Sequence, residues 1–311
     1  MKNDISMTEE MKNQKAAFVA IVGRPNVGKS SILNKLVGQK IAIVSKKPQT
    51  TRTRIIGVMT RDEGQLVFVD TPGLIKPKNA LGKYMVKSVV QSVTGVDACM
   101  LVVEAGKPVS NADMDLIERF RKEKMPAILA LNKIDKLADK SLMMKQISDY
   151  TELYDFKAYI PVSAKTGDGM SALLEELFAF PQEGGYFFPE DALTDQPERV
   201  IAAEIVREKL LRLLGEEIPH GTAAVTETMK ERSGIMDIDI TIFCERANHK
   251  GIIIGKGGAM LKKIGTAARE DMEKFLGCKV NLQLWVKVKE DWRQRPETLH
   301  RFGFDERKIL E

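Results

Sequence analysis

The sequence predicts an α/β domain, with a mostly parallel sheet and helices on both faces, followed by a smaller α+β domain. Two observations predict the first domain. Short apolar segments alternate with helical segments, and a glycine-rich loop with the spacing of a phosphate-binding site follows the first apolar segment. A third observation predicts the second domain: the alternation of strands and helices stops at a stretch rich in glycine and proline that begins near residue 181. A chain of 311 residues is long enough for two such domains.

The composition is that of an ordinary soluble globular protein, with 43% hydrophobic and 29% charged residues. The first sixteen residues are polar and lack the apolar core of a signal peptide, and no apolar stretch reaches the length of a membrane span. The three cysteines, Cys99, Cys244 and Cys278, are too few and too scattered for a disulfide framework or a zinc site. We therefore expect a cytoplasmic protein.

The net charge of +5 is unevenly distributed along the chain. Residues 245–311 contain 15 Lys and Arg against 10 Asp and Glu, whereas the rest of the chain contains 33 of each. This asymmetry is consistent with a polyanionic partner, and equally with a solvated basic face.

The first functional motif is a phosphate-binding loop. The apolar run 17–22 is typical of a buried strand and residues 31–36 are typical of a helix, so the loop between them joins a strand to a helix N-terminus and forms an anion site. Lys29 would reach the β- and γ-phosphates, and Ser30 Oγ would bind Mg²⁺. A glycine turn that opens a surface helix is the alternative. The loop has the G-x-x-x-x-G-K-[ST] spacing and consists of Gly23, Arg24, Pro25, Asn26, Val27, Gly28, Lys29 and Ser30.

A basic loop and a second short motif follow. Residues 40–54 contain the sequence P-Q-T-T-R and lack a clean period, which predicts a mobile loop. Two short strands are expected at 55–60 and 66–69. The Asp70 carboxylate after the second strand can hold Mg²⁺ directly or through water, and the Gly73 N–H can approach a γ-phosphate because no Cβ obstructs it. The motif consists of Asp70, Thr71, Pro72 and Gly73.

Two further loops follow later strands of the same sheet, where ligands bind at the carboxyl ends of the strands. Further strands are expected at 98–103, 127–131 and 158–162, with a helix at 111–124. The last two strands are followed by Asn132, Lys133, Ile134 and Asp135, and by Ser163, Ala164 and Lys165.

The chemistry of these two loops suits guanine. Asp135 can accept hydrogen bonds from guanine N1–H and the N2 amine, a pair that adenine lacks. Lys133 would lie across the base, and Asn132 would tie this loop to the phosphate loop. The Ala164 N–H can donate to guanine O6. Each motif alone is compatible with chance, but all of them in this order predict a guanine nucleotide site.

Together these motifs resemble those of the translation-factor class of GTPases, and the forms GRPNVGKS, PQTTR and DTPGL resemble the Era family. The resemblance implies that the threonine-rich loop and the segment after DTPG are nucleotide-sensing switches. It implies that Thr51 or Thr50 completes the Mg²⁺ shell, beside Ser30 and Asp70. The catalytic residues that it implies are Lys29, Asn26, Thr51 and Gly73.

The residue after Gly73 departs from Ras-like enzymes. Leu74 stands where those enzymes place the glutamine that orients the attacking water, and leucine can neither orient nor deprotonate water. The resemblance suggests instead a K⁺ ion, bound partly by Asn26 and the first switch. Slow intrinsic hydrolysis is expected.

The second domain is predicted to follow the order helix, strand, strand, helix, helix, strand. The expected elements are a helix at 198–215, strands at 222–232 and 236–246, helices at 249–254 and 259–276, and a strand at 280–288.

A glycine-rich loop lies between the two consecutive helices. Its G-x-x-G sequence, in this αββααβ order, resembles a KH domain of the prokaryotic type (type II), in which RNA phosphates pack against a loop without side-chain bulk. A simple helix bend is the alternative. The candidate RNA-binding residues are Ile254, Gly255, Lys256, Gly257, Gly258, Lys262 and Lys263.

The last segments, 291–295 and 301–304, mix arginines with aromatic residues. Such residues could stack on bases, and a tail packed on its own domain is equally compatible with them.

The resemblance extends from about residue 17 to residue 304. It implies a polar extension (1–16), a GTP-binding domain (17–180), a linker (181–197), a KH domain (198–290) and a tail (291–311). It also implies a monomeric GTPase of small-ribosomal-subunit assembly that binds ribosomal RNA near its 3′ end. Peripheral membrane contact is implied too, and it would be weak and electrostatic because the sequence shows no anchor.

Two other functional classes remain open. A metabolic P-loop kinase would need an acceptor-substrate pocket, and residues 132–135 favour guanine instead. A signalling switch would have a protein partner and use the second domain as a scaffold.

Overall fold

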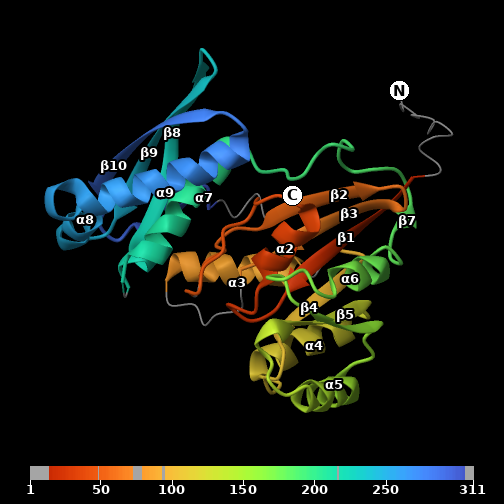
Figure 1. Ribbon diagram of the computed structural model, residues 1–311. Coiled ribbons are helices and arrows are strands. Elements are labelled where there is room, and N and C mark those ends of the chain that lie inside the picture. The colour runs from red at the N-terminus through yellow and green to blue at the C-terminus, as the bar shows by residue number, and fades with distance from the viewer. Residues whose placement is uncertain (1–13, 48, 73–78, 93–94, 216, 305–311) are drawn as a thin grey trace, which may run out of the picture. The chain divides into compact units, whose positions relative to one another are not determined.

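The computed structural model describes residues 14–47, 49–72, 79–92, 95–215 and 217–304 (Figure 1). The described chain divides into two compact units. The first contains residues 14–39, 54–72 and 88–195, and the second contains residues 40–53, 79–87 and 196–304, apart from the gaps given above.

The first unit is built on one sheet with the strand order β2-β3-β1-β4-β5-β6, and β7 pairs with β1. The pairings are parallel except β2 with β3 and β7 with β1, as expected for strands that alternate with helices. The strands are β1 (Lys15–Val22), β2 (Ile55–Arg61), β3 (Gly64–Asp70), β4 (Ala98–Glu104), β5 (Ala127–Asn132), β6 (Ala158–Val162) and β7 (Gln182–Glu183).

Helices cover the sheet because its central strands are apolar on both faces. Leu116, Ile117 and Phe120 of α4 and Tyr150 of α5 pack in one core with inward residues of β1, β4 and β5. The helices with bounds in this part of the chain are α2 (Lys29–Val37), α3 (Ala80–Ser92), α4 (Asn111–Glu123), the 3₁₀ turn η1 (Ile134–Lys136), α5 (Ser141–Leu153) and α6 (Met170–Leu177).

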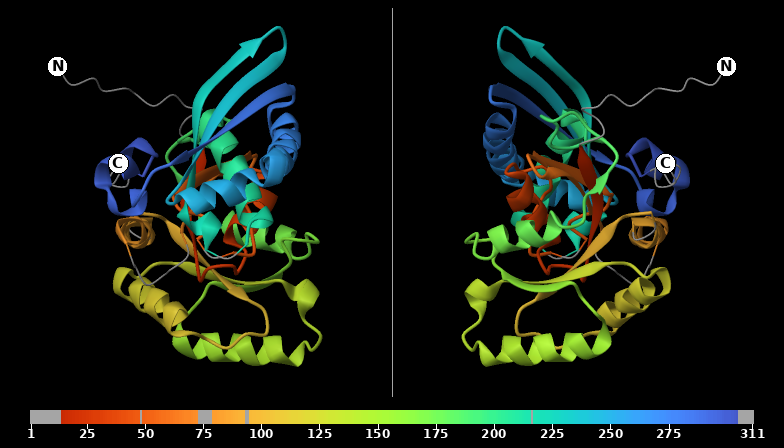
Figure 2. Two further views of the ribbon diagram at one scale, coloured as in Figure 1. Left: turned by 90° about the vertical axis from the view of Figure 1, so that its left-hand side faces the viewer. Right: turned by 90° about the vertical axis from the view of Figure 1, so that its right-hand side faces the viewer.

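The second unit has the expected order of elements. Its three-stranded sheet has the order β10-β9-β8, with β9 parallel to β10 and antiparallel to β8. The β8–β9 hairpin extends away from the helices of the unit (Figure 2). The elements are α7 (Glu198–Leu213), η2 (Ile218–Gly221), β8 (Thr222–Arg232), β9 (Ile235–Cys244), α8 (Ala247–Ile254), η3 (Lys256–Gly258), α9 (Ala259–Leu276), β10 (Lys279–Val288), η4 (Trp292–Gln294) and α10 (Pro296–Arg301).

The core of this unit lies between one face of the sheet and the helices. Ile238, Ile240 and Ile242 of β9 alternate into it, and Ile205, Val206 and Leu210 of α7 and Ile264, Ala268 and Met272 of α9 pack against them. Each of these side chains is almost fully buried. The predicted period of two in β9 therefore separates a helix-covered face from an opposite face.

The tail packs on this unit. Trp292 is fully buried and its Nε1–H donates to the Gly221 carbonyl at 2.9 Å, while the ring of Phe302 lies 4.6 Å from that of Phe243. The interpretation of Trp292 as a base-stacking residue is therefore wrong, because its ring is part of a core. In the part of the chain that the structure describes, no helix is both long and apolar enough to cross a membrane.

Candidate nucleotide site and nucleic-acid interface

Five loops of the first unit begin where its strands end. Parallel strands β1, β3, β4, β5 and β6 end at Val22, Asp70, Glu104, Asn132 and Val162. Because the carboxyl ends of parallel strands meet at one edge of a sheet, the predicted phosphate and base loops start from the same edge.

Two glycines of the phosphate loop are required by sterics. A Cβ at Gly23 would lie 2.3 Å from the Val102 carbonyl oxygen, and one at Gly28 would lie 2.2 Å from Asn132 Nδ2. Both residues have positive φ, 145° and 106° respectively, which side chains disfavour. The loop therefore packs directly on the neighbouring strand end and on the base-loop asparagine.

Lys29 begins α2 with its ammonium turned back into the loop. Its Nζ donates to the carbonyls of Gly23 and Arg24, each at 3.0 Å. The side chain is nearly buried, and burial lowers the pKa of Lys29 to about 8 although the nearby Asp70 opposes this shift. An anion at this loop would restore the preference for the charged form.

The two predicted Mg²⁺ ligands of this unit are in contact. Ser30 Oγ donates to Asp70 Oδ2 at 2.6 Å, and Asp70 is fully buried. Next to it, Thr71 Oγ1 donates to the Ile21 carbonyl at 3.0 Å and fixes the start of the loop after β3. A hydroxyl and a carboxylate held together are oxygen ligands of the kind that Mg²⁺ prefers, so these residues fit the ion. Gly73 and Leu74 lie outside the described residues.

The base loops are tied to the phosphate loop through Asn132. Its Nδ2 donates to the Val27 carbonyl at 2.8 Å, and its Oδ1 accepts from the Ala164 N–H at 3.1 Å. Lys133 has a positive φ of 69°, and its Nζ donates to the Asn26 carbonyl at 2.6 Å. Because the Ala164 N–H donates to Asn132 Oδ1, a guanine O6 would compete with this oxygen for the N–H.

Asp135 is oriented by the last loop. Ser163 Oγ donates to Asp135 Oδ1 at 2.7 Å, and Lys165 Nζ lies 3.9 Å from Oδ2. Ser163 thus engages one carboxylate oxygen of Asp135, and the other oxygen faces the Lys165 ammonium, whose side chain is 81% exposed. The two loops expected to read the base therefore lie together.

Glu104, at the end of β4, was not identified from the sequence. Its carboxylate accepts a hydrogen bond from Lys133 Nζ at 2.5 Å. Burial disfavours ionisation of Glu104, but this bond and the charge of Lys133 hold the pKa of the carboxyl below its usual range. Glu104 therefore fixes the lysine that is expected to lie along the base.

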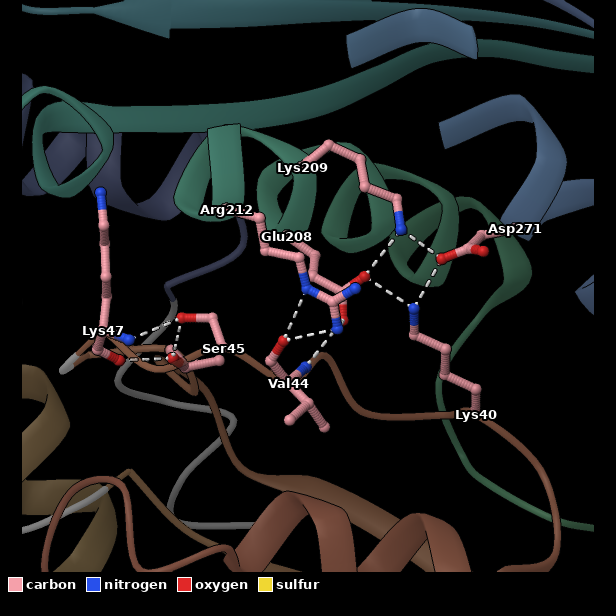
Figure 3. Close-up of polar contacts among 9 residues, drawn as sticks. Lys40, Val44, Ser45, Lys47, Glu208, Lys209, Arg212 and Asp271 are labelled. Atoms are coloured by element: carbon pink, nitrogen blue, oxygen red, sulfur yellow. Dashed lines mark hydrogen bonds and ion pairs between the residues drawn. The ribbon is translucent and has the colours of Figure 1, made fainter. Parts of the chain in front are cut away.

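The predicted first switch belongs to the second unit. Residues 40–53 are held there by a buried carboxylate, that of Glu208 on α7 (Figure 3). Glu208 Oε2 accepts from Lys40 Nζ at 2.6 Å, and Oε1 accepts from the Val44 N–H at 2.9 Å. Burial disfavours its charge, but these bonds keep the pKa of Glu208 below its usual value.

Two further residues complete this cluster (Figure 3). Arg212 Nη2 donates to Glu208 Oε1 at 3.0 Å, and Lys209 Nζ donates to Oε2 at 3.0 Å. Asp271 of α9 accepts from both Lys209 and Lys40. Burial opposes ionisation of Asp271, yet these bonds lower its pKa to about 2.

Arg52 anchors the other end of the segment. Its guanidinium is almost fully buried and donates to the Thr222 carbonyl at 2.7 Å and the His220 carbonyl at 2.8 Å. It also lies 5.8 Å above the Trp292 ring. Burial, with the nearby Arg207, lowers the pKa of Arg52 to about 9.

Thr50, one of the two candidate Mg²⁺ ligands of the switch, is bonded within the same unit. Thr50 Oγ1 donates to the Lys47 carbonyl at 2.7 Å, and the Thr50 carbonyl accepts from Arg207. Thr51 is 7% exposed. The structure therefore places Ser30 and Asp70 in one unit, and Thr50 and Thr51 in the other.

The G-x-x-G loop joins α8 to α9. A Cβ at Gly255 would lie 2.8 Å from Met260 Cβ, so this glycine is needed for packing. Gly257 and Gly258 have φ values of 60° and 82°, and a Cβ at either would meet nothing within 4 Å. Open space above two glycines is the geometry expected of a loop that a phosphate approaches.

A groove of about 350 Å³ begins beside this loop. Its walls are the exposed side of α9 and the edge strand β10, and it combines apolar side chains with cations. Lys263 is exposed nearby, whereas Ile254 is only partly exposed and packs against the core. The lining residues are Gly258, Leu261, Lys262, Gly265, Thr266, Arg269, Leu282 and Leu284, of which the sequence predicted only Gly258 and Lys262.

Comparison with protein families matches both units. The family described as 50S ribosome-binding GTPase matches residues 18–133, and the KH domain family matches residues 217–293. The predicted fold class, a P-loop GTPase domain followed by a KH domain, is confirmed.

The whole chain is similar to proteins named GTPase Era. It is 49% identical to that of Ruminiclostridium cellulolyticum and 48% identical to that of Clostridioides difficile, each over 94% of this chain and 99% of the relative. Two solved structures match with a TM-score of 0.89 and 39% identity, over 94% of this chain and 99% of theirs. One is a single-residue variant of Aquifex aeolicus Era bound to GDP·AlF₄⁻, and the other is Era in complex with MgGDPNP and nucleotides 1506–1542 of 16S ribosomal RNA.

Proposed function

The chain belongs to the GTPase Era family, and from this premise we propose that it is a GTP-hydrolysing switch that binds ribosomal RNA of the small subunit through its KH domain and acts in assembly of that subunit. The observation that supports the nucleotide half best is the Ser30–Asp70 contact at 2.6 Å, beside a buried lysine and a base loop tied to the phosphate loop. The KH half is supported by the open glycine loop and the groove beside it.

The phosphates would bind in the loop 23–30. Its backbone amides and the N-terminus of α2 present positive dipole to the anion, and Lys29 would turn from the Gly23 and Arg24 carbonyls to the β- and γ-phosphates. Mg²⁺, held by Ser30 and Asp70, would supply charge neutralisation of the phosphate oxygens. Gly73 would donate its N–H to the γ-phosphate.

The base would be read by Asp135, whose carboxylate is held by Ser163. Guanine offers it two donors and adenine does not, so a bound adenine would cover this acceptor and leave it without a partner. Lys133, fixed by Glu104, would cover the base with its aliphatic stem.

The phosphate loop is also held by α4, because Arg24 of the loop lies 3.4 Å from the Asp113 carboxylate of that helix.

The threonine that completes the Mg²⁺ shell would come from residues 40–53. That threonine is Thr51 or Thr50. The Thr50 hydroxyl donates to the Lys47 carbonyl, so binding Mg²⁺ through Thr50 would require this hydroxyl to turn away from Lys47. Leu74 cannot orient the attacking water as a glutamine would, so we propose a different aid, a K⁺ ion bound partly by Asn26 and the first switch, which would supply charge where other GTPases use an arginine finger. Intrinsic hydrolysis is then slow.

The α9–β10 groove would bind a segment near the 3′ end of the small-subunit ribosomal RNA. Lys256, Lys262 and Lys263 would neutralise phosphates, and Leu282 and Leu284 would contact bases. Any contact with a membrane would be weak and electrostatic, and the protein would act as a monomer. Co-sedimentation with anionic vesicles across a salt series and light scattering of the free protein test these two points.

The experiment for the RNA half replaces Gly257 with aspartate. The backbone there is left-handed, a conformation that Asp tolerates, and the added side chain meets nothing within 4 Å, so the fold should persist. The carboxylate would stand where phosphate packs, so RNA affinity should fall at least tenfold, with intrinsic GTP hydrolysis unchanged. Filter binding and a GTPase assay on one preparation measure both. A folded variant that binds single-stranded RNA like the parent would show that the loop is only a helix bend.

A further inference from the structure

Trp285 is the most exposed aromatic side chain of the KH sheet's outer face, among the described residues. It lies on β10 and is 56% exposed, whereas the other tryptophan, Trp292, is fully buried. Burying a tryptophan is strongly favourable, so one left in water on a rigid strand is available for a partner.

Strand parity places Trp285 away from the helices. Leu282, Leu284 and Val286 face the core with α7 and α9, so their alternating neighbours Gln283, Trp285 and Lys287 face the opposite side. In register, Trp285 stands beside Thr241 of β9, which in turn stands beside Val225 of β8. We define the outer face by the side chains that share this side: Ala223, Val225, Thr228, Lys230, Arg232, Ile235, Asp237, Asp239, Thr241, Phe243, Lys279, Asn281, Gln283, Trp285 and Lys287.

The described part of the tail, residues 291–304, packs on one end of this outer face. The ring of Phe302 lies 4.6 Å from that of Phe243, and Ala223 packs in the same cluster with Trp292. On β10 the residues of the outer face stay exposed, namely Lys279, Asn281, Gln283, Trp285 and Lys287. The open part of the face is thus the β10 side of the sheet.

The charges of the outer face favour a polyanion. It contains four cations, Lys230, Arg232, Lys279 and Lys287, and two carboxylates. Both carboxylates are occupied within the sheet: Asp237 accepts from Asn281 at 2.8 Å and pairs with Arg232 at 3.2 Å, and Asp239 accepts from Thr228. A phosphate backbone meets a net positive surface there.

The outer face is continuous with the proposed RNA groove across a single strand. Leu282 and Leu284 of β10 line the groove, and Trp285, the next residue, projects from the other side of the same strand. Because β10 is the edge of the sheet, an RNA that leaves the groove over this edge reaches the indole directly. A KH groove clamps about four nucleotides, whereas the RNA in the similar Era complex spans 37 nucleotides.

We propose that the outer face of the KH sheet is a second RNA-binding surface, on which an unpaired base stacks on Trp285 while Lys287 and Lys279 contact the flanking phosphates. The proposal rests on the proposed function, because it extends the RNA path from the groove. Stacking on an exposed aromatic residue of an open sheet face tolerates any base, so this surface would add affinity and direction rather than sequence readout.

Substitution of Trp285 tests the proposal with the full-length chain. The probes are the RNA equivalent to nucleotides 1506–1542 and fragments of it shortened from either end. Trp285→Ala should weaken binding of the longest RNA by roughly 5- to 150-fold, the cost of one lost base stack, and Trp285→Phe should restore part of it. Fragments that fill only the groove should bind both variants like the parent. Met144→Ala, at a residue 64% exposed on α5, is the matched control and should change nothing.

Fluorescence gives a readout that does not depend on affinity. The spectrum of the parent minus that of Trp285→Phe isolates the exposed indole, and stacking should quench it with the long RNA and protect it from acrylamide. Emission that stays unchanged, together with Trp285→Ala binding of every RNA at the parent's affinity, would overturn the proposal. If the parent fails to bind any of these RNAs, the proposed function itself fails. A loss seen only with whole small subunits, and not with naked RNA, would show that the face binds a protein instead.

Discussion

Replacing Glu208 with alanine should loosen residues 40–44, although Arg212 would still donate to the Val44 carbonyl and Lys40 to Asp271. The Glu208 side chain is fully buried, and four donors meet at its two oxygens. The variant would leave the Val44 N–H without its acceptor, which costs about 1–3 kcal/mol, and would remove a charge-assisted bond from the buried Lys209, which is worth about 1.5–3 kcal/mol.

The other two partners contribute less. Lys40 is 34% exposed and Arg212 is 49% exposed, so water can replace their bonds, and each surface pair is worth about 0–1 kcal/mol. Lys209 would still pair with Asp271 in the variant, which reduces the cost of leaving its ammonium without Glu208. We expect the free energy of unfolding of this unit to fall by about 2–4 kcal/mol.

Denaturant unfolding measures the loss of stability, and hydrogen exchange measures the loosening of the segment around Val44. The Val44 amide should lose its protection in Glu208→Ala, while amides of β9 should stay protected against local opening. Glu231→Ala, at an exposed position of β8, is the control and should change stability by less than about 0.5 kcal/mol. If Glu208→Ala keeps both the stability of the parent and the protection of the Val44 amide, the Glu208 carboxylate does not hold this segment.

The remaining predictions concern the nucleotide and RNA sites. Burial lowers the pKa of Lys29 to about 8, and bound phosphate favours the charged form of this lysine. GTP affinity should therefore fall about tenfold between pH 7 and pH 9, with proton uptake on binding. Calorimetry in buffers of different ionisation enthalpy measures both, and an affinity that does not change with pH would contradict this prediction. Hydrolysis should be faster in KCl than in NaCl at equal ionic strength, and Asn26→Ala should erase most of the difference; equal rates for the parent would exclude K⁺. Lys262→Ala and Lys263→Ala should each lower the log–log salt slope of RNA binding by about one unit, and unchanged slopes would remove these lysines from the interface.

Elements with strong local patterns could be predicted from the sequence. In the KH unit, β9 and β10 alternate with a period of two and α9 follows a period of 3.6, and α9 was expected at its observed bounds, 259–276. The phosphate loop and Asn132 could be placed because each follows a strand of one parallel sheet. These inferences depend on neighbours along the chain.

What the sequence could not show depends on contacts between distant residues. Trp292 was open to two interpretations because it is buried by residues far along the chain, among them Gly221 and Tyr84, as well as by Phe302 of the tail. Residues 40–54 were expected to form a mobile loop, but Glu208 holds Val44 across 164 positions of sequence. A glutamate on a helix gives no local signal of such a partner. The same holds for Glu104, which is seen to fix Lys133 only in three dimensions.

Asp135→Asn tests directly whether the first unit selects guanine through the Asp135 carboxylate. The substitution exchanges an acceptor for a donor at the base, so preference should move from GTP to XTP. Competition binding of the two nucleotides to parent and variant measures the change, with Asp139→Asn, at an exposed residue just before α5, as the control. The variant should bind XTP more tightly than GTP, while the control should keep the parent's preference. An Asp135→Asn protein that still prefers GTP as the parent does would show that this carboxylate does not contact the base.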